Sequence, residues 1–195
     1  PNRIDLGLGR TPGTDQATAN AIRSDFRQAA MSFPNEVSKI QNYFSLENSK
    51  QAVRANVAEG VTVPLFILGS SKDSAHLASE KGLPYAFASH FSSSQLLAAL
   101  DIYRSQFQAS KELEQPYTIA GISVIIADSD EQAEFFSSSY YMRVLGILTG
   151  NRAPLEEPFE ITDEFRRIIQ QPAVQQMTKY TVIGSKETVK AKVRK

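Results

Sequence analysis

The stretch from Leu65 to Phe91 constrains the fold more than any other part of this chain. An apolar run, LFIL, stops at Gly69 and is followed by a serine-rich turn, a helical segment, a Gly-Leu-Pro turn and a second apolar run. This order predicts a strand, a helix and a strand. Because strands that alternate with helices pair in parallel through right-handed crossovers, the stretch predicts an α/β fold.

Three serines mark the point where the first of these strands gives way to the helix. Ser71 stands at the expected N-cap and Ser74 at the third helical position, with Ser70 just before them. A helix start offers unpaired backbone N–H groups and the positive end of the helix dipole, so hydroxyls added there predict a phosphate site. Serines also cap helices without any ligand, and this stretch alone leaves both interpretations open.

The strand and helix signals recur along the chain. The apolar segment 3–9 predicts a further strand, and the nearly continuous apolar segment 117–127 predicts a strand buried on both faces. Residues 180–183 are short and apolar, without a clear strand signal. Pro34 is expected at the first position of a helix. The remaining helix starts are predicted by capping residues, namely Ser129 with Gln132, Thr162 and Ser185.

The number of strands bears on the architecture. Four clear strands cannot close a (β/α)8 barrel, which typically needs roughly 250 residues. The 195 residues therefore form either a small open α/β sheet or about half of such a barrel. The chain begins without Met, and no Gly or Asn follows its last helix. We expect residues 1–195 to be a single domain excerpted from a longer protein, truncated at both ends.

Composition excludes several classes of function. The 21 basic and 21 acidic residues balance, so we expect neither a nucleic-acid nor an anionic membrane partner. The chain has no cysteine, which excludes disulfides, thiolate metal sites and a cysteine nucleophile, and which fits the cytoplasm. No apolar run approaches the length of a membrane span. No metal-ligand motif, HExxH sequence or Walker-type loop is present either.

Two further residues are candidates for a site. Arg10 follows the first strand, so it should lie on the same side of a parallel sheet as Ser71 and suit a phosphate dianion; the alternative is a surface arginine paired with Asp15. His90 ends the YAFASHF segment, on the face where barrel enzymes place their chemistry. It is a candidate catalytic residue, as a donor to developing negative charge or a proton carrier. The alternative is a histidine bonded to a loop carbonyl.

Three segments together carry a resemblance to a family. RIDLGLGRTPGTD, LFILGSSKDSAHLASEKGLPYAFASHF and IGSKETV are similar to the bacterial luciferase-like, flavin-dependent monooxygenases, especially the small single-subunit homologues of luciferase alkanal monooxygenase. The resemblance covers nearly the whole chain in order. It implies a (β/α)8 TIM-barrel fold, of which this chain would hold the middle and later part. The catalytic histidine of luciferase-type enzymes comes from an early strand, which the resemblance implies would precede residue 1.

The resemblance also implies a reduced-FMN site and an activity. The positions that match the family's phosphate contacts are Arg10, Thr11, Pro12, Ser70, Ser71 and Ser74. Bacterial luciferase has a carboxylate where this chain has Ser70, so Ser71 and Ser74 match better. The implied activity is oxygenation of a small organic substrate with reduced FMN and O2.

The resemblance further implies partners and leaves rival functions open. Reduced FMN would come from a separate reductase, because no GxGxxG fingerprint is present. A homodimer is compatible with the family. One alternative is a non-catalytic flavin-binding protein of the nonfluorescent flavoprotein type. Another is an unrelated α/β protein that binds a phosphorylated metabolite.

Overall fold

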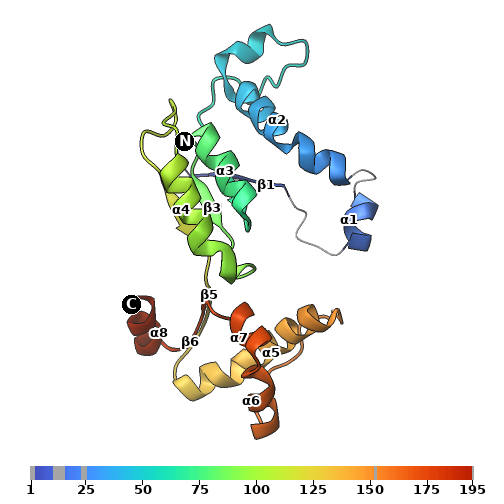
Figure 1. Ribbon diagram of the computed structural model, residues 1–195, viewed down its shortest axis with the longest axis vertical. Coiled ribbons are helices and arrows are strands. Elements are labelled where there is room, and N and C mark those ends of the chain that lie inside the picture. Colours follow the sequence, from blue (N-terminus) through green and yellow to red (C-terminus); the bar gives the residue numbers. More distant parts are fainter. Residues whose placement is uncertain (1–2, 11–15, 23–25, 152, 195) are drawn as a thin grey trace. The chain divides into compact units, whose positions relative to one another are not determined.

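The computed structural model describes residues 3–10, 16–22, 26–151 and 153–194, along which helices alternate with parallel strands (Figure 1). Internal contacts divide the chain into two compact units. Unit 1 comprises Pro1–Phe87 and Leu97–Ile119, and unit 2 comprises Ala88–Leu96 and Ala120–Lys195. Each unit is described by itself below.

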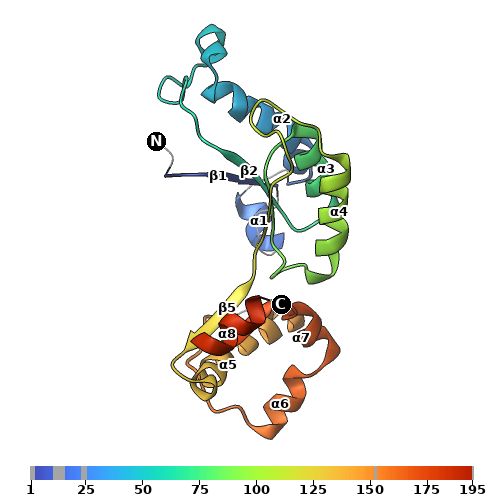
Figure 2. The same cartoon turned by 90° about the vertical axis from the view of Figure 1, so that its left-hand side faces the viewer.

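Unit 1 contains the first strands and helices of the chain. Its elements are β1 (Leu6–Gly9), α1 (Gln16–Ile22), α2 (Phe26–Phe44), the 3-10 helix η1 (Leu46–Lys50), β2 (Leu65–Gly69), α3 (Lys72–Lys81), β3 (Tyr85–Phe87), nearly all of α4 (Leu96–Gln106) and the start of β4 (Thr118–Ala120). The strand order is β1-β2-β3-β4. Figures 1 and 2 show α3 and α4 beside one another, and His76 Nδ1 joins them through a 2.8 Å contact to Gln106 Oε1.

The register of unit 1 fixes which residues share an edge of the sheet. Strands β1 and β2 run parallel with Leu6 opposite Leu65 and Gly9 opposite Leu68. Strand β3 is parallel to β2 as well. The carboxyl ends of β1 and β2 therefore lie side by side, and the residues that follow these strands emerge at one edge.

The core of unit 1 lies between this sheet and the helices α3 and α4. It is formed by buried side chains of the strands, of the helix faces turned toward them and of the turn between α3 and β3: Leu65, Ile67, Ala75, Ala78, Leu83, Tyr85, Phe87, Ala99 and Tyr103. The small alanines let the helices approach the strands closely, while the tyrosine hydroxyls find partners inside. Tyr103, for example, donates to the Leu83 carbonyl at 2.9 Å.

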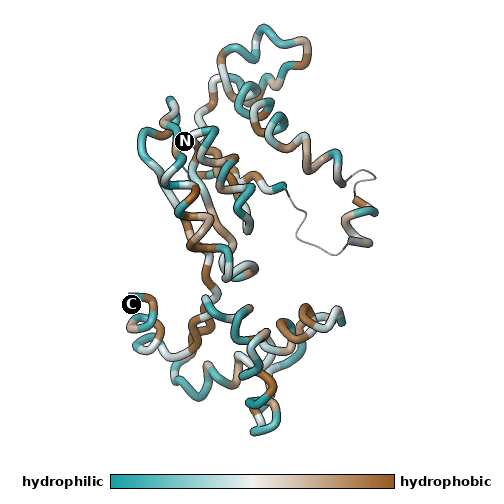
Figure 3. The backbone as a smooth tube through the Cα atoms, viewed as in Figure 1, coloured by the Kyte–Doolittle hydropathy of each residue, from teal (hydrophilic) through white to brown (hydrophobic). Residues whose placement is uncertain are grey.

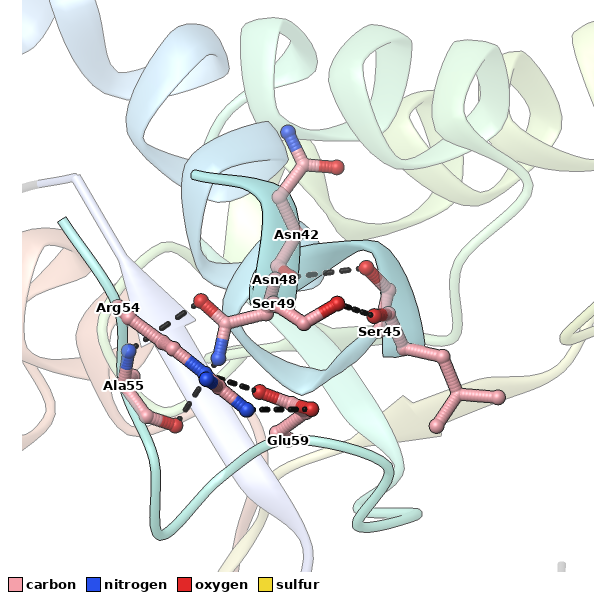
Figure 4. Close-up of polar contacts among 8 residues, drawn as sticks. Asn42, Ser45, Asn48, Ser49, Arg54, Ala55 and Glu59 are labelled. Carbon is pink, nitrogen blue, oxygen red and sulfur yellow. Dashed lines mark hydrogen bonds and ion pairs between the residues drawn. The ribbon is translucent and has the colours of Figure 1, made fainter. Parts of the chain in front are cut away.

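The connection between α2 and β2 is irregular but extensively hydrogen-bonded. The side chain of Asn48 is fully buried and bonds both the N–H and the carbonyl of Ala55, at 3.2 and 3.0 Å (Figure 4). Arg54 binds the Glu59 carboxylate through two nitrogens, which raises the pKa of the guanidinium further. These bonds hold the loop in one shape although Val57 on its outside is 94% exposed.

Unit 2 is built on a pair of parallel strands. Its elements are the 3-10 helix η2 (Ser93–Gln95), β5 (Ser123–Ala127), α5 (Asp130–Thr149), α6 (Asp163–Ile169), α7 (Pro172–Met177), β6 (Thr181–Ser185) and α8 (Lys186–Val193). Ser123 pairs with Thr181 and Ala127 with Ser185. Helices α5 and α8 pack against the strands, and a second cluster around Val144, Ile169 and Val174 joins α5, α6 and α7.

The predicted caps of unit 2 are confirmed. The Ser129 hydroxyl accepts the Gln132 N–H, and the Thr162 hydroxyl accepts that of Phe165. Ser185 caps α8 in the same way, through the N–H of Thr188. Each of these bonds satisfies one of the backbone donors that a helix start leaves unpaired.

Two expectations about secondary structure are wrong. Residues 117–127 form two strands, because β4 belongs to the four-stranded sheet whereas β5 pairs with β6. The Gly121 carbonyl between them accepts the Ser89 hydroxyl at 2.5 Å. Strand β5, a brown stretch of the tube in Figure 3, is not buried on both faces: Val124 and Ile126 are 45% and 52% exposed. Helices α5 and α8 cover the other face of this strand.

Pro34 does not begin a helix either. It lies inside α2, which runs on from Phe26 to Phe44. A proline in a helix removes one backbone hydrogen bond. Val37, one turn later, is almost completely buried, and we attribute the continuity of α2 to this burial. Among the described residues, no helix combines the length and the apolar character needed to cross a bilayer.

Candidate functional site

The start of α3 is the place where the predicted site residues of unit 1 gather. Ser71 is the N-cap in extended conformation, but its side chain makes no capping bond. The Ser74 hydroxyl instead donates to the Ser71 carbonyl at 2.6 Å. Ser70, half-buried, joins β2 to this turn. The Ser71 hydroxyl and the first backbone N–H groups of α3 thus stand at the carboxyl edge of the sheet.

A glycine makes this arrangement possible. A Cβ built on Gly69, the last residue of β2, would lie 2.0 Å from the Ser74 hydroxyl oxygen and 2.2 Å from its Cβ. Only a residue without a side chain lets Ser74 sit over the end of the strand. Gly82 ends the same helix in the left-handed conformation, with φ 58°, and its N–H bonds the last carbonyls of α3.

Tyr85 supports the first turn of α3 from below. Its side chain is 0% exposed, and its hydroxyl lies 2.9 Å from Ser74 Oγ and 3.1 Å from the Ser71 carbonyl oxygen. Burial raises the pKa of the Tyr85 hydroxyl, and the hydrogen bond with Ser74 opposes that rise. The tyrosine therefore stays protonated and acts as a donor within the turn.

Arg10 reaches the same turn from the neighbouring strand. Both Nη1 and Nη2 lie 3.3 Å from Oδ2 of Asp73, in the first turn of α3. The two side chains are 37% and 72% exposed, so the pair is open to solvent. Asp15, the partner in the alternative interpretation, lies outside the described residues, as do Thr11 and Pro12. The structure thus brings Arg10, through Asp73, to the turn that contains Ser71 and Ser74.

The chemistry of this group suits a phosphate. A guanidinium binds phosphate oxygens in pairs, and a helix start adds backbone N–H donors and a favourable dipole. The exposed Lys72 adds a second positive charge at the first position of α3. Asp73 opposes them with one negative charge. We name the set Arg10, Ser71, Asp73, Ser74 and Tyr85 the α3 cluster.

His90 belongs to unit 2, whereas the α3 cluster belongs to unit 1. It stands three residues beyond the end of β3, in a turn closed by the bond from the Phe91 N–H to the Ala88 carbonyl. Its ring packs on Phe91 with centroids 4.5 Å apart. Nδ1 is buried and has no hydrogen-bond partner, so this nitrogen does not make the loop-carbonyl bond of the alternative interpretation. A buried, unpaired ring nitrogen can hold or move a proton for a bound molecule.

Unit 2 also has a hollow of about 490 Å³ beside β6 and helices α5, α6 and α8. Its charged groups are engaged within the protein. Glu134 and Arg166 form an ion pair, and Lys192 donates to the Ile183 carbonyl at 2.9 Å. Asp130 accepts bonds from the Ser185 N–H and the Thr188 hydroxyl, which lower the pKa of its carboxyl. No cluster of three or more metal-ligating side chains occurs in the described part of the chain.

Two members of the α3 cluster escaped the sequence interpretation. Asp73 was readable only as an acidic residue in a first turn, since its partner is distant in sequence. Tyr85 had a weak signal: a tyrosine in a buried strand needs a partner for its hydroxyl, and the serine-rich turn was one of several polar segments that could supply it.

The chain is similar to known proteins in sequence and in fold. The family model described as luciferase-like monooxygenase matches residues 1–195. The uncharacterized protein YvbT of Bacillus subtilis is 42% identical over 99% of this chain and 57% of its own length. A luciferase-like monooxygenase of Escherichia coli is 39% identical over 97% of this chain and 57% of its own length. The chain thus spans somewhat more than half the length of these relatives.

A solved structure shows the same fold. The crystal structure of apo-MsnO8 superposes with a TM-score of 0.79, at 23% sequence identity, over 100% of this chain and 59% of that one. Together with the parallel strands of both units, this likeness confirms the predicted α/β fold class. The chain corresponds to part of a luciferase-like (β/α)8 barrel. That residues 1–195 form one domain stays a prediction.

Proposed function

Because this chain belongs to the luciferase-like monooxygenase family, we propose that it binds reduced FMN through the α3 cluster and takes part in oxygenating a small organic substrate with O2. The family generally uses reduced flavin. The observation that carries the proposal is the meeting of Arg10, at the end of β1, with the first turn of α3, at the end of β2. Two segments distant in sequence there combine a cation with helix-start donors.

The residues present fit the phosphate of FMN. Arg10 supplies a fork of N–H donors, Ser71 a hydroxyl without a capping bond, and α3 its unpaired backbone N–H groups. Ser70, Thr11 and Pro12 complete the proposed set, and Thr11 and Pro12 lie outside the described residues. When bound, the flavin supplies the oxygen chemistry, and the protein anchors and orients it.

His90 is proposed to serve the reaction as a proton carrier or hydrogen-bond donor. The support is its buried, unpaired Nδ1 in the turn that follows β3. Such a group gains a partner when a ligand with a complementary donor or acceptor arrives. We further propose a separate reductase as the source of reduced FMN, a cytoplasmic location and a homodimer, all in line with the family resemblance.

The first test is a pair of titrations of the full-length protein, with FMN and with riboflavin, followed by flavin fluorescence. A clear preference for FMN is expected, because riboflavin lacks the phosphate. Equal affinities would refute the phosphate site and favour a different phosphorylated ligand. A second experiment supplies reduced FMN from a separate reductase and measures O2 consumption with and without candidate substrates. Flavin binding without substrate-dependent O2 consumption would identify a flavin carrier instead of an oxygenase.

A further inference from the structure

Three oxygen atoms at the start of α3 form a closed triangle. Ser74 Oγ lies 2.6 Å from the Ser71 carbonyl oxygen, Tyr85 Oη lies 3.1 Å from the same oxygen, and the two hydroxyls are 2.9 Å apart. All three distances are within hydrogen-bonding range. Two of the atoms carry a proton and the third carries none.

The two hydroxyl protons of Ser74 and Tyr85 can form at most two hydrogen bonds among these three oxygen–oxygen contacts. The Ser71 carbonyl is that of an N-cap residue, which already accepts the first backbone bond of the helix and so keeps one further lone pair. The hydroxyls of Ser74 and Tyr85 compete for it. The shorter distance favours Ser74 as the donor to the carbonyl, with Tyr85 then donating to Ser74 Oγ. Turning both hydroxyl protons gives a second arrangement, in which Tyr85 bonds the carbonyl and the Ser74 proton points elsewhere.

We propose that Tyr85 is a positioning residue for the phosphate, because it takes over the Ser71 carbonyl when Ser74 turns its proton toward a phosphate oxygen. The inference rests on the proposed function, since it assumes a phosphate at the start of α3. The change needs only rotation about two C–O bonds, because the heavy atoms already lie at bonding distances. Without the phenol, Ser74 would have to abandon the carbonyl oxygen in order to bind the ligand.

The second hydrogen bond from Tyr85 to the Ser71 carbonyl matters because this oxygen is shielded from water on the side of the tyrosine. Tyr85 is 0% exposed, so solvent does not reach the carbonyl from the side of the tyrosine. A carbonyl oxygen that keeps its helix bond but loses its second partner away from water loses hydrogen bonding that water cannot replace. Part of the energy gained between Ser74 and a phosphate would then be lost in the turn itself. With Tyr85 present, that loss does not occur.

Tyr103 provides a matched control. Its hydroxyl is also buried, donates to the Leu83 carbonyl at 2.9 Å and accepts the Tyr117 N–H at 3.2 Å, so it bonds no residue of the α3 cluster. The two rings pack against each other with centroids 5.4 Å apart. Tyr85→Phe and Tyr103→Phe thus remove the same atom from the same core, and each keeps its ring.

The experiment measures dissociation constants for FMN and riboflavin in full-length wild type, Tyr85→Phe, Tyr103→Phe, Ser74→Ala and the double variant Tyr85→Phe/Ser74→Ala. We expect Tyr85→Phe to lower the preference for FMN roughly threefold to tenfold, and Tyr103→Phe to leave it unchanged. In the Ser74→Ala background, Tyr85→Phe should not lower the preference for FMN any further, because the Ser74 hydroxyl proton that Tyr85 releases for the phosphate is already absent.

The outcomes separate the two proposals. A wild-type protein without preference for FMN overturns the proposed function, and the role of Tyr85 falls with it. If the wild type prefers FMN, two results overturn only the role of Tyr85. In one, Tyr85→Phe keeps the full preference for FMN; in the other, Tyr85→Phe lowers that preference equally in the wild-type and the Ser74→Ala backgrounds. If Tyr85→Phe does not fold, Ser74→Ala decides alone: an undiminished preference for FMN in that variant overturns the inference.

Discussion

The Arg10 guanidinium touches the Asp73 carboxylate oxygen Oδ2 through two nitrogens, each at 3.3 Å. This contact links the residue after β1 to the second residue of α3. It places the only charge pair of the α3 cluster, among the described residues, at the edge where β1 and β2 both end. A phosphate bound here would therefore be attracted by the Arg10 guanidinium and repelled by the Asp73 carboxylate, and each effect can be tested separately.

Replacing Arg10 should weaken FMN binding selectively. Arg10→Ala removes hydrogen bonds to a charged group, which are worth about 1.5–3 kcal/mol, so the dissociation constant for FMN should rise roughly 10- to 100-fold. The constant for riboflavin should hardly change. Arg104→Ala is the control, since Arg104 is an exposed arginine of α4 that bonds the Thr118 hydroxyl. Parallel losses for both ligands would contradict the assignment of Arg10.

Removing the charge of Asp73 should have the opposite effect. The carboxylate competes with a phosphate for Arg10 and repels it, and exposed ion pairs are worth roughly 0.2–1 kcal/mol. Asp73→Asn is therefore expected to tighten FMN binding about twofold to fivefold at low salt, and less in high salt. Glu80→Gln, at the other end of α3, controls for net charge. Weaker FMN binding by Asp73→Asn would mean that the carboxylate serves mainly to hold Arg10 in place.

A methyl group at Gly69 should disrupt the start of α3. The added Cβ would lie 2.0 Å from Ser74 Oγ, so Gly69→Ala is expected to lower the free energy of unfolding by about 1–3 kcal/mol and to weaken FMN binding. Gly9→Ala is the matched control at the end of β1, where the nearest atoms stand 3.8 Å from the new Cβ. Urea denaturation of both variants measures the difference. Similar stabilities would show that the turn adapts freely.

The buried amide of Asn48 should stabilise the connection before β2. Asn48→Ala leaves the N–H and the carbonyl of Ala55 without their partner, which is expected to cost about 1–3 kcal/mol of unfolding free energy. Ser49→Ala, which removes an exposed hydroxyl bonded to the Leu46 carbonyl, should cost less than about 0.5 kcal/mol. Urea denaturation and amide exchange of the loop test this prediction. Equal losses in the two variants would argue against the role of Asn48.

Asp130 should make the stability of unit 2 depend on acid. Bonds from the Ser185 N–H and the Thr188 hydroxyl lower the pKa of its carboxyl in the folded state. The contribution is therefore complete above the unfolded value of about 3.9 and is lost as the pH falls through the folded value. Urea unfolding between about pH 5 and pH 2 should show a smaller loss of stability in Asp130→Asn than in wild type. Asp101→Asn, on α4, should follow the wild-type curve.

The local parts of this fold could be predicted from the sequence. The strand, helix and strand around α3 were predictable because an apolar run, capping serines and the Gly-Leu-Pro turn each act within a few residues. The caps Ser129, Thr162 and Ser185 follow the same logic. Such signals act within one turn of the chain and do not depend on what packs against it.

What failed depends on distant contacts. The division of residues 117–127 into two strands depends on the different sheets in which β4 and β5 pair, and the continuity of α2 through Pro34 is attributed to the burial of Val37. The site divides in the same way. The serines and Arg10 were predictable from their places after strands and from the family resemblance, whereas the contacts to Asp73 and Tyr85 exist only after the strands have paired.

The distance in sequence between Arg10 and Asp73, 63 positions, has a kinetic consequence. The parallel pairing of β1 with β2 closes a loop that contains α1, α2 and the whole connection after them. Closing such a long loop is slow, whereas the bonds between the start of α3 and Tyr85 span only 11 and 14 positions. The helix start will thus be ready early in folding and the arginine will arrive late. Binding of a phosphate by Arg10 together with the start of α3 would then indicate that β1 has paired with β2.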